Sequence, residues 1–318
     1  MASLSTNYRL FDWHCDTASA MLNQDQPLGY NSLAVSLENA RKFRQYAQVM
    51  ACFTSPKLSD HEGWERLQLM HQNLLQDPAI RSGEAVVYTF CPPKDHTTAL
   101  LLALEDARIL ENDLSRVEDL YRMGFRIMTP LWSGVTCMGG SHNTSAGLSD
   151  FGKEAISLAV QKGMLPDISH ASDASAEEIL LIAEQHGRPV IASHSNARAI
   201  CPVSRNLTKQ QIHSILRLGG VIGLNLYTAF LSDQHKATKE DVLRHVEYFL
   251  EQGAEHALCL GCDMDGAALP EDIPNLAALP DLADFLLQYY SGQTVQNIFY
   301  QNAYQFAERA LPPSAEKR

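Results

Sequence analysis

Six side chains that could bind metal ions or transfer protons follow short apolar runs in this sequence. The runs read RLFDW, LLAL, LPDIS, PVIAS and ALCLG. Imidazole and carboxylate groups in combination suit zinc and similar first-row divalent ions. The sequence therefore indicates a metal site built from strand ends. The six residues are His14, Asp16, Glu105, His170, His194 and Asp263.

The spacing of these residues indicates how two ions could be held. His14 and Asp16 are two positions apart, so on a strand they would share one face. One ion could take this pair and a second could take His170 and His194, while the two oxygens of Glu105 could bridge both. Two ions roughly 3.5–4 Å apart would share a water or hydroxide and polarise a substrate carbonyl. The pattern favours metal-assisted hydrolysis.

A single histidine after a strand would be weak support, because such a residue is more often structural. Several strands that each end in a ligand-type residue are different, since charged groups gathered in one place need partners or a metal. Asp265 also follows the last strand, and we expect it to stabilise its loop. Eight other histidines lie in helical or polar contexts and are interpreted as surface or packing residues: His61, His71, His96, His186, His213, His235, His245 and His256.

The elements that carry the six residues alternate along the chain. Short apolar runs are followed by amphipathic helical patterns, which predicts parallel strands joined by crossover helices. Eight strands favour a closed β/α (TIM-type) barrel, in which all the strand C-termini meet on one face. No G-x-G-x-x-G follows a strand and no Walker loop occurs, so nucleotide-binding folds lose their main support. The predicted strands cover 9–13, 48–53, 101–105, 124–129, 164–169, 189–193, 221–227 and 257–261.

Capping signals and apolar periodicity predict the helices. Ser175 with Glu178, and Thr208 with Gln211, read as capping boxes, and Thr238 begins a further helix. Another helix is predicted over 150–162, and the segments LADFLLQYY and VQNIFYQNAYQFAERAL predict two helices at the C-terminus. The segment 131–148 is rich in Gly, Ser, Thr and Asn, and such a long loop at the top of a barrel is expected to be functional. We interpret residues 1–318 as one domain.

Composition narrows the class of protein. The 318 residues carry a formal net charge of −12, and no dense Lys/Arg run favours a nucleic-acid partner. The seven cysteines are odd in number, MASLSTNYRL lacks the apolar region of a signal peptide, and no apolar run reaches the ~18 residues of a membrane span. We therefore expect free thiols, a cytoplasmic location and no membrane association. Cys259 and Cys262 form a C-x-x-C, but without a second pair they are interpreted as buried small residues.

At these residues the sequence resembles the membrane (renal) dipeptidase family of the amidohydrolase superfamily. The matching segments are WHCD, ALED, ISH, ASHSNARAICPVSRNLT, GCDMDG and GLSDFGKEAISLAVQKGMLPDISHASD, within about residues 8–310. The resemblance implies a barrel with two zinc ions that hydrolyses dipeptides. His14 and Asp16 would then hold one zinc, His170 and His194 the other, and Glu105 would bridge.

The same resemblance implies roles for two further residues. Asp263 would handle protons for the bridging hydroxide and the leaving amine. Arg205, in SRN, would pair with the substrate's C-terminal carboxylate, a role that suits the two parallel hydrogen bonds of a guanidinium. GFRIMT contains no lysine, which fits a glutamate bridge between the metals. The chain ends in SAEKR, unlike the lipid-anchored tail of the secreted relatives.

One position departs from the family pattern. Related mammalian enzymes carry a substrate-contacting histidine where this chain has Trp132, and His142, ten residues further on, is not expected to replace it. An indole N–H donates a hydrogen bond but cannot take a positive charge. An alternative is therefore a binuclear amidohydrolase or lactonase with a non-dipeptide substrate. A non-catalytic metal-binding barrel is disfavoured, because it would not require Asp263. In each enzyme reading the partner is a small molecule, and a homodimer is compatible.

Overall fold

The core of the protein is a parallel β-sheet that curls into a barrel. The structure, a computed structural model, describes residues 8–94, 98–234 and 236–312. Its eight main strands run in the order β8-β5-β4-β2-β1-β11-β10-β9, and a short strand, β3, pairs with β4. The strand bounds are Arg9–Cys15 (β1), Gln45–Phe53 (β2), Val86–Val87 (β3), Thr98–Glu105 (β4), Phe125–Thr129 (β5), Leu165–Pro166 (β8), Ile191–Ala192 (β9), Val221–Leu224 (β10) and Leu258–Leu260 (β11).

The sheet closes between its first and last strands. A parallel bridge pairs Asp167 with Ile191, and the Ile168 amide donates to the Ile191 carbonyl over 2.9 Å. These contacts complete the circle from β8 to β9, so the predicted β/α barrel is confirmed. All eight predicted strands exist, although several are shorter than the apolar runs that predicted them. His96, His235 and the terminal SAEKR segment lie outside the described residues.

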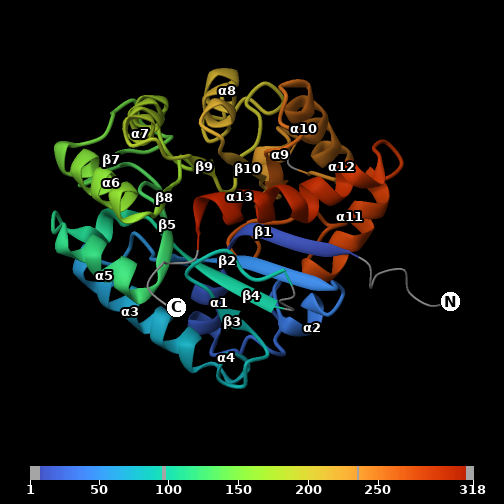
Figure 1. Cartoon of the computed structure of the whole chain (residues 1–318), viewed down its shortest axis with the longest axis horizontal. Helices are drawn as coiled ribbons and strands as arrows, with labels where there is room; N and C mark the ends of the chain where they lie inside the picture. Colours follow the sequence, from blue (N-terminus) through green and yellow to red (C-terminus); the bar gives the residue numbers. More distant parts are fainter. Residues whose placement is uncertain (1–7, 95–97, 235, 313–318) are drawn as a thin grey trace.

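Helices surround the barrel in chain order. In Figure 1, α3, α5, α6, α7, α8 and α10 follow one another around the outside of the strands. The helices are Thr17–Gln24 (α1), Leu37–Ala40 (α2), Asp60–Gln76 (α3), Pro78–Arg81 (α4), Ser115–Met123 (α5), Asp150–Lys162 (α6), Asp173–Gln185 (α7), Lys209–Arg217 (α8), Thr228–Leu231 (α9), Lys239–Glu251 (α10), Leu279–Leu286 (α11), Gly292–Gln296 (α12) and Asn302–Ala310 (α13).

The helix predicted over 150–162 is confirmed as α6, and so are two of the three helix starts predicted from capping residues. Thr208 caps α8 in a capping box with Gln211, and Thr238 precedes α10. The predicted box at Ser175 is wrong, because Ser172 caps α7 one turn earlier. The Ser175 hydroxyl instead donates to the Gly140 carbonyl over 2.7 Å. The Ser172 hydroxyl accepts from the Ser175 amide, so Ser175 lies inside the first turn of α7.

Strand alternation sorts the apolar side chains into two clusters. Phe11, Trp13 and Leu101 belong to a cluster inside the barrel, while their neighbours in sequence pack against the helices. The C-terminal helices cover the end of the barrel at which β1 begins. The Trp13 ring contacts the Phe306 ring edge-on at 5.4 Å, and the Arg9 guanidinium lies 4.5 Å from the Tyr300 ring. The opposite end of the barrel is left for the strand C-termini.

Other expectations of the sequence concern cysteines and membranes. All seven cysteines are free, as predicted, and Cys259 and Cys262 are buried. None of the groups of candidate metal ligands found among the described residues contains a cysteine. Within the described ranges, no helix combines the length and apolarity needed to cross a bilayer.

His245, on α10, is a buried packing residue that supports the loop after β9. Its Nδ1 accepts from the Ala197 amide over 3.2 Å, and its Nε2 lies 3.0 Å from the Leu231 carbonyl oxygen. Burial lowers the pKa of His245 from 6.5 to about 4. Below pH 6.5 the unfolded chain therefore binds a proton that the folded chain excludes until about pH 4.

We predict that His245→Gln flattens the loss of stability on acidification. The wild type should lose about 2 kcal/mol between neutral pH and pH 5 through this residue, at about 1.4 kcal/mol for each pH unit below the unfolded pKa. Glutamine keeps one acceptor and one donor without titrating. Urea unfolding near pH 7 and pH 5 measures the difference. His213→Gln, at an exposed position on α8, is the matched control. Equal pH dependence in wild type and His245→Gln would contradict the prediction.

Candidate metal centre

His14 reaches the mouth of the barrel because β1 is irregular near its end. Asp12 pairs with Gln48, whereas Cys15 pairs with Met50, so three residue steps on β1 face two on β2. Such a bulge shifts the alternation of side chains. Trp13 lies in the inner cluster and Cys15 in the outer one, which places the inward-to-outward change at His14.

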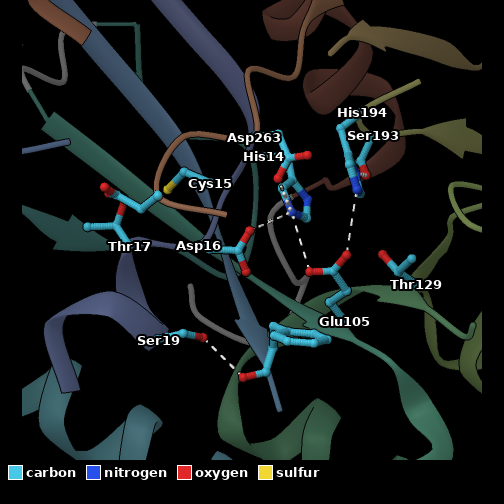
Figure 2. Close-up of polar contacts among 12 residues, drawn as sticks. His14, Cys15, Asp16, Thr17, Ser19, Glu105, Thr129, Ser193, His194 and Asp263 are labelled. Atoms are coloured by element: carbon cyan, nitrogen blue, oxygen red, sulfur yellow. Dashed lines mark hydrogen bonds and ion pairs between the residues drawn. The ribbon is translucent and has the colours of Figure 1, made fainter. Parts of the chain in front are cut away.

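His14 and Asp16 lie close together as predicted, but the predicted reason for their closeness is wrong. We expected two residues of one strand to share a face. Instead β1 ends at Cys15, and Asp16 precedes the first turn of α1. The two side chains still meet, with His14 Nε2 lying 3.4 Å from Asp16 Oδ2. Figure 2 shows Cys15 pointing away on the other side of the chain.

Glu105 is the centre of the group. It ends β4 on the inner face shared with Leu101 and Ala103, as regular alternation requires. Its Oε1 lies 3.0 Å from His170 Nε2 and 3.6 Å from His194 Nε2. Its Oε2 lies 3.5 Å from His14 Nε2. Figure 2 shows this carboxylate between His14 and His194.

The structure brings all six predicted residues together. His170 Nε2 and His194 Nε2 are 2.9 Å apart, and Asp263 Oδ1 lies 3.9 Å from His14 Nε2. Three overlapping triads have their ligand atoms within 4.8 Å of one another. The triads are His14 with Asp16 and Glu105, Glu105 with His170 and His194, and His14 with His194 and Asp263.

Two of these residues have an unusual backbone. His170 has φ of 69° and Asp263 has φ of 60°, in the left-handed region that side chains other than glycine seldom adopt. Strain of this kind persists where surrounding contacts impose it, often at functional sites. The left-handed turn follows β8 in one case and β11 in the other, and it directs each side chain toward the barrel mouth.

The residues fit a divalent cation. His14 is 1% exposed, Glu105 3% and His194 1%. Both ring nitrogens of His14 and Oδ1 of Asp16 are buried without a hydrogen-bond partner among the described residues. Buried polar atoms ordinarily have partners, and carboxylate oxygens and imidazole nitrogens are ligands of zinc-like ions. Cations placed among these atoms would satisfy them.

Protonation also fits metal binding. Burial, followed by the positive charge of Arg205, lowers the pKa of His170 to about 3. Burial and the charge of His14 lower the pKa of His194 well below its usual value. Both rings are therefore neutral near pH 7, the form that binds metals. At His14 burial opposes the charged form, but Glu105 and Asp16 outweigh it and raise the pKa. The two carboxylates thus favour the positively charged form of the His14 ring.

Asp263 lies beside the group and is suited to proton transfer. Burial raises its pKa to about 7, although the nearby His14 acts in the opposite direction. Asn225 Nδ2 donates to Asp263 Oδ2 over 3.0 Å, which fixes the carboxyl group. A carboxyl group with a pKa near the operating pH can both accept and return a proton.

A cavity of about 350 Å³ opens onto these residues. Its walls include Asp16, Glu105, His170 and Asp263, together with four aromatic side chains. Those aromatic residues are Phe53, Trp132, Tyr227 and Phe230. A larger hollow of about 590 Å³ lies on the outside between α6 and α7 and contains no histidine. The chemistry therefore belongs to the cavity at the barrel mouth.

The long segment 131–148 contributes to this cavity. It contains a small hairpin of β6 (Val135–Thr136) and β7 (Gly139–Gly140). Trp132 is half-buried, with its ring 4.9 Å from Phe53 and 6.2 Å from His170. His142, which the sequence analysis did not expect to replace the missing histidine, also lines the cavity. The predicted functional loop thus supplies part of the wall.

Arg205 lies behind the cavity wall rather than in it. It is 3% exposed, and its guanidinium donates to Ser195 Oγ over 2.6 Å and to the His194 carbonyl over 2.9 Å. The guanidinium carbon lies 5.4 Å from the Phe230 ring. Its charge nevertheless acts in the cavity. Burial is the main cause of the lowered pKa of His142, and the positive charge of Arg205 is the second cause.

Sequence reasoning missed two residues beside the site. Asn225 holds Asp263, and it stands in the apolar run VIGLNLY after β10, where the rule used for the other ligands would have found it. Gly266 faces Asp16, and only the structure reveals that closeness. Asp265 behaves as predicted: it accepts from Thr17 Oγ1 over 2.6 Å and from the Ala34 amide over 2.7 Å.

A closed parallel barrel with imidazoles and carboxylates at its C-terminal mouth defines the class of metal-dependent barrel enzymes. Comparison with known proteins narrows this class. The profile of the membrane dipeptidase family (Peptidase family M19) matches residues 1–311. The chain belongs to this family, and the resemblance noted in the sequence is confirmed. It is therefore a hydrolase of the metallo-dipeptidase type, and membership implies divalent metal ions.

Individual relatives agree with this assignment. Dipeptidase 3 of Macaca fascicularis is 25% identical over 335 residues, which cover 99% of this chain and 68% of that protein. A solved M19 metallopeptidase called dipeptidase AC has a TM-score of 0.88 at 22% identity, over 96% of this chain and 100% of that one. A metallopeptidase from Rhodobacter sphaeroides, solved with a phosphinate mimic of the dipeptide L-Ala-D-Ala, has a TM-score of 0.87 at 22% identity, over 96% of this chain and 99% of that one.

We predict that Gly266→Ala impairs hydrolysis without unfolding the protein. A Cβ at this exposed position would stand 2.0 Å from Asp16 Oδ2 and 2.7 Å from Asp263 Oδ1. Both carboxylates would have to move, and misplacement by about 1 Å can cost about 10²-fold in rate. Dipeptide hydrolysis and thermal melting measure the two effects. Gly292→Ala, whose Cβ would lie 3.9 Å from Leu287 in ordinary van der Waals contact, is the control. Wild-type turnover in Gly266→Ala would refute the prediction.

Proposed function

We propose that the chain is a zinc-dependent dipeptidase with two metal ions in each chain. His14, Asp16 and Glu105 would hold one ion, and Glu105, His170 and His194 the other. One observation carries this proposal: the two oxygens of the buried Glu105 carboxylate face different histidines, with Oε1 at 3.0 Å from His170 Nε2 and Oε2 at 3.5 Å from His14 Nε2. A carboxylate placed between two sets of ligands suits a bridge.

The donor set favours zinc, because imidazole nitrogen and carboxylate oxygen together match its preferences. When bound, the two ions would supply an acidified water as nucleophile and polarise the substrate carbonyl. Asp263 accepts the proton of the attacking water and delivers it to the leaving amine. The Asn225 amide orients this carboxyl group throughout, through its 3.0 Å hydrogen bond to Oδ2.

The cavity supports a small substrate with apolar side chains. Its volume of about 350 Å³ lies at the lower end of the range for small-molecule sites, and aromatic rings form much of its wall. The Rhodobacter sphaeroides relative holds a mimic of the dipeptide L-Ala-D-Ala. We infer a dipeptide as substrate, with Trp132 packing against one of its side chains.

Arg205 would favour the free carboxylate of such a dipeptide. Its guanidinium is buried and already donates to Ser195 and His194. In this proposal its positive charge acts on the carboxylate through the low-dielectric wall formed by Phe230, where charges are screened less than in water. This role needs the charge more than a particular hydrogen bond.

A second candidate function is hydrolysis of another amide or a lactone. Trp132 and the position of Arg205 behind the wall motivate it, since neither places a charged group on the cavity surface. Such a substrate would need no free carboxylate. The metal ions, Glu105 and Asp263 would keep the same roles.

The decisive experiment measures metal content and hydrolysis together. Purified full-length protein is expected to contain about two zinc-like ions per chain. A panel of dipeptides with L- and D-residues at the C-terminal position, beside lactones and simple amides, would be assayed with and without chelator. Dipeptide hydrolysis that chelator abolishes and zinc restores supports the proposal. Absence of metal after zinc is added would overturn it, and turnover of lactones or simple amides alone would favour the second candidate.

Asp263→Asn is expected to keep both ions and to lower turnover by about 10²–10⁴-fold. Asparagine preserves the shape of the side chain but cannot carry the proton, and general acid–base groups contribute rate factors of this size. Metal analysis and kcat are measured on the same preparation. If turnover is unchanged, the proton-transfer role is wrong. If metal is lost as well, Asp263 acts as a ligand instead.

Arg205→Ala is expected to raise KM about 10-fold or more for dipeptides with a free carboxylate and to spare their methyl esters. Two unit charges about 8 Å apart attract each other by about 2 kcal/mol at the effective dielectric constant of about 20 that suits protein sites. Arg205→Lys keeps the charge and should retain most of the preference for the free acid. Steady-state kinetics on acid and ester pairs measure the effect. An equal change for acids and esters would show that Arg205 only supports the fold.

A further inference from the structure

Ser193 links the buried carboxylate of Asp167 to Nδ1 of His194, the ring nitrogen that does not face Glu105. Asp167 follows β8 and Ser193 follows β9, at the two strands between which the barrel closes. Both residues are buried, with Asp167 0% and Ser193 1% exposed. Ser193 Oγ donates to Asp167 Oδ2 and lies 2.7 Å from His194 Nδ1. Figure 2 shows Ser193 beside the His194 ring.

We propose that Asp167 and Ser193 are positioning residues, which hold His194 as the Nδ1–H tautomer so that the Nε2 lone pair faces the metal ions. This inference rests on the proposed function, because it takes His194 as a metal ligand. Neither residue touches the substrate or the ions. They act through His194 alone.

The direction of the hydrogen bonds follows from counting donors. Asp167 is surrounded by donors: its Oδ1 accepts from the amides of Ser169 and Ser193 over 2.9 and 3.0 Å, and its Oδ2 accepts from Thr129 Oγ1 over 2.7 Å. The single hydroxyl proton of Ser193 therefore points to Asp167. Ser193 Oγ is left as an acceptor toward His194 Nδ1, which must carry the proton. Nε2 then keeps its lone pair.

His194 differs in this respect from the other two histidines of the group. The Nδ1 atoms of His14 and His170 are buried and have no hydrogen-bond partner among the described residues. Of these three histidines, His194 alone has a hydrogen bond within the described residues that fixes which ring nitrogen is protonated. A hydrogen bond at the ring nitrogen that does not bind the metal orients a ligand histidine and increases its basicity. Loss of such a hydrogen bond typically weakens metal binding about 10–100-fold.

A purely structural role is the alternative, because Asp167 also joins the strands at the closure of the barrel. The two roles separate at Ser193. Its backbone amide, rather than its hydroxyl, donates to Asp167 Oδ1, so Ser193→Ala keeps that link between the strands. It removes only the hydroxyl between Asp167 and His194. A change confined to stability would indicate a structural role, whereas a change in tautomer or metal affinity indicates positioning.

The first test measures the tautomer in the wild-type protein, and a substitution serves only to assign the signals. Long-range proton–nitrogen NMR of full-length protein with ¹⁵N-histidine reports the tautomer of each ring, with the His194 signals assigned by their loss in His194→Gln. We expect His194 to be protonated at Nδ1 near neutral pH, both before and after zinc is added. An Nε2–H tautomer in the zinc-free protein would overturn the inference, even if zinc binds and dipeptides are hydrolysed.

The second test measures zinc affinity by competition with a chromophoric chelator. Ser193→Ala should bind one of its two ions about 10–100-fold more weakly than wild type, with a similar melting temperature. Ser193→Thr restores a hydroxyl and should recover most of the affinity. Ser175→Ala is the matched control, because it removes another buried serine hydroxyl, on α7, that donates to the Gly140 carbonyl.

The outcomes are distinguishable. If wild type binds no zinc, the proposed function fails, while the tautomer measurement still decides the hydrogen-bond arrangement. If wild type binds zinc and Ser193→Ala binds it equally well, the positioning role fails and the proposed function stands. If Ser193→Ala does not fold, the tautomer of His194 in the wild type decides.

Discussion

The burial of the Glu105 carboxylate among three histidines is the constraint on which the structure depends. A charged carboxylate inside a barrel is costly unless opposite charge or hydrogen bonds compensate for it. Here His14, His170 and His194 approach its two oxygens from three strand ends. Despite burial, Glu105 and Asp16 raise the pKa of His14, which favours a compensating positive charge there, and divalent ions would carry that charge in the proposed enzyme. The rest of the barrel mouth is arranged around this group.

Local distortions of a regular barrel produce that arrangement. A bulge in β1 turns His14 inward, and left-handed turns at His170 and Asp263 direct two more side chains to the same point. Each distortion costs conformational free energy, and the contacts of the packed barrel impose it. Buried hydrogen bonds then fix the side chains, with Asn225 on Asp263 and Ser193 on His194. Rigid support of this kind keeps reacting groups within the small tolerances that catalysis requires.

The cavity wall also contains residues that are not candidate metal ligands. Aromatic rings and the 131–148 segment form this part of the wall, and the charge of Arg205 acts from behind that wall. One cavity wall thus holds both the proposed metal ligands with Asp263 and the groups that would select a substrate. In the proposed enzyme, Trp132 would alter the surface that meets the substrate and leave the hydrolytic centre unchanged.

The sequence by itself determined the barrel, the six converging residues and the family. Parallel strands place their C-terminal ends on one face, so a polar residue after each apolar run is enough to predict where it lies. Only the tertiary structure decided that Asp16 belongs to the start of α1, that Ser172 rather than Ser175 caps α7, and that Arg205 stands behind the wall. It also decided the contacts of Asp167 and Ser193. Those features depend on bulges, side-chain partners and depth of burial, which arise from contacts between residues far apart in the chain and leave no local pattern in the sequence.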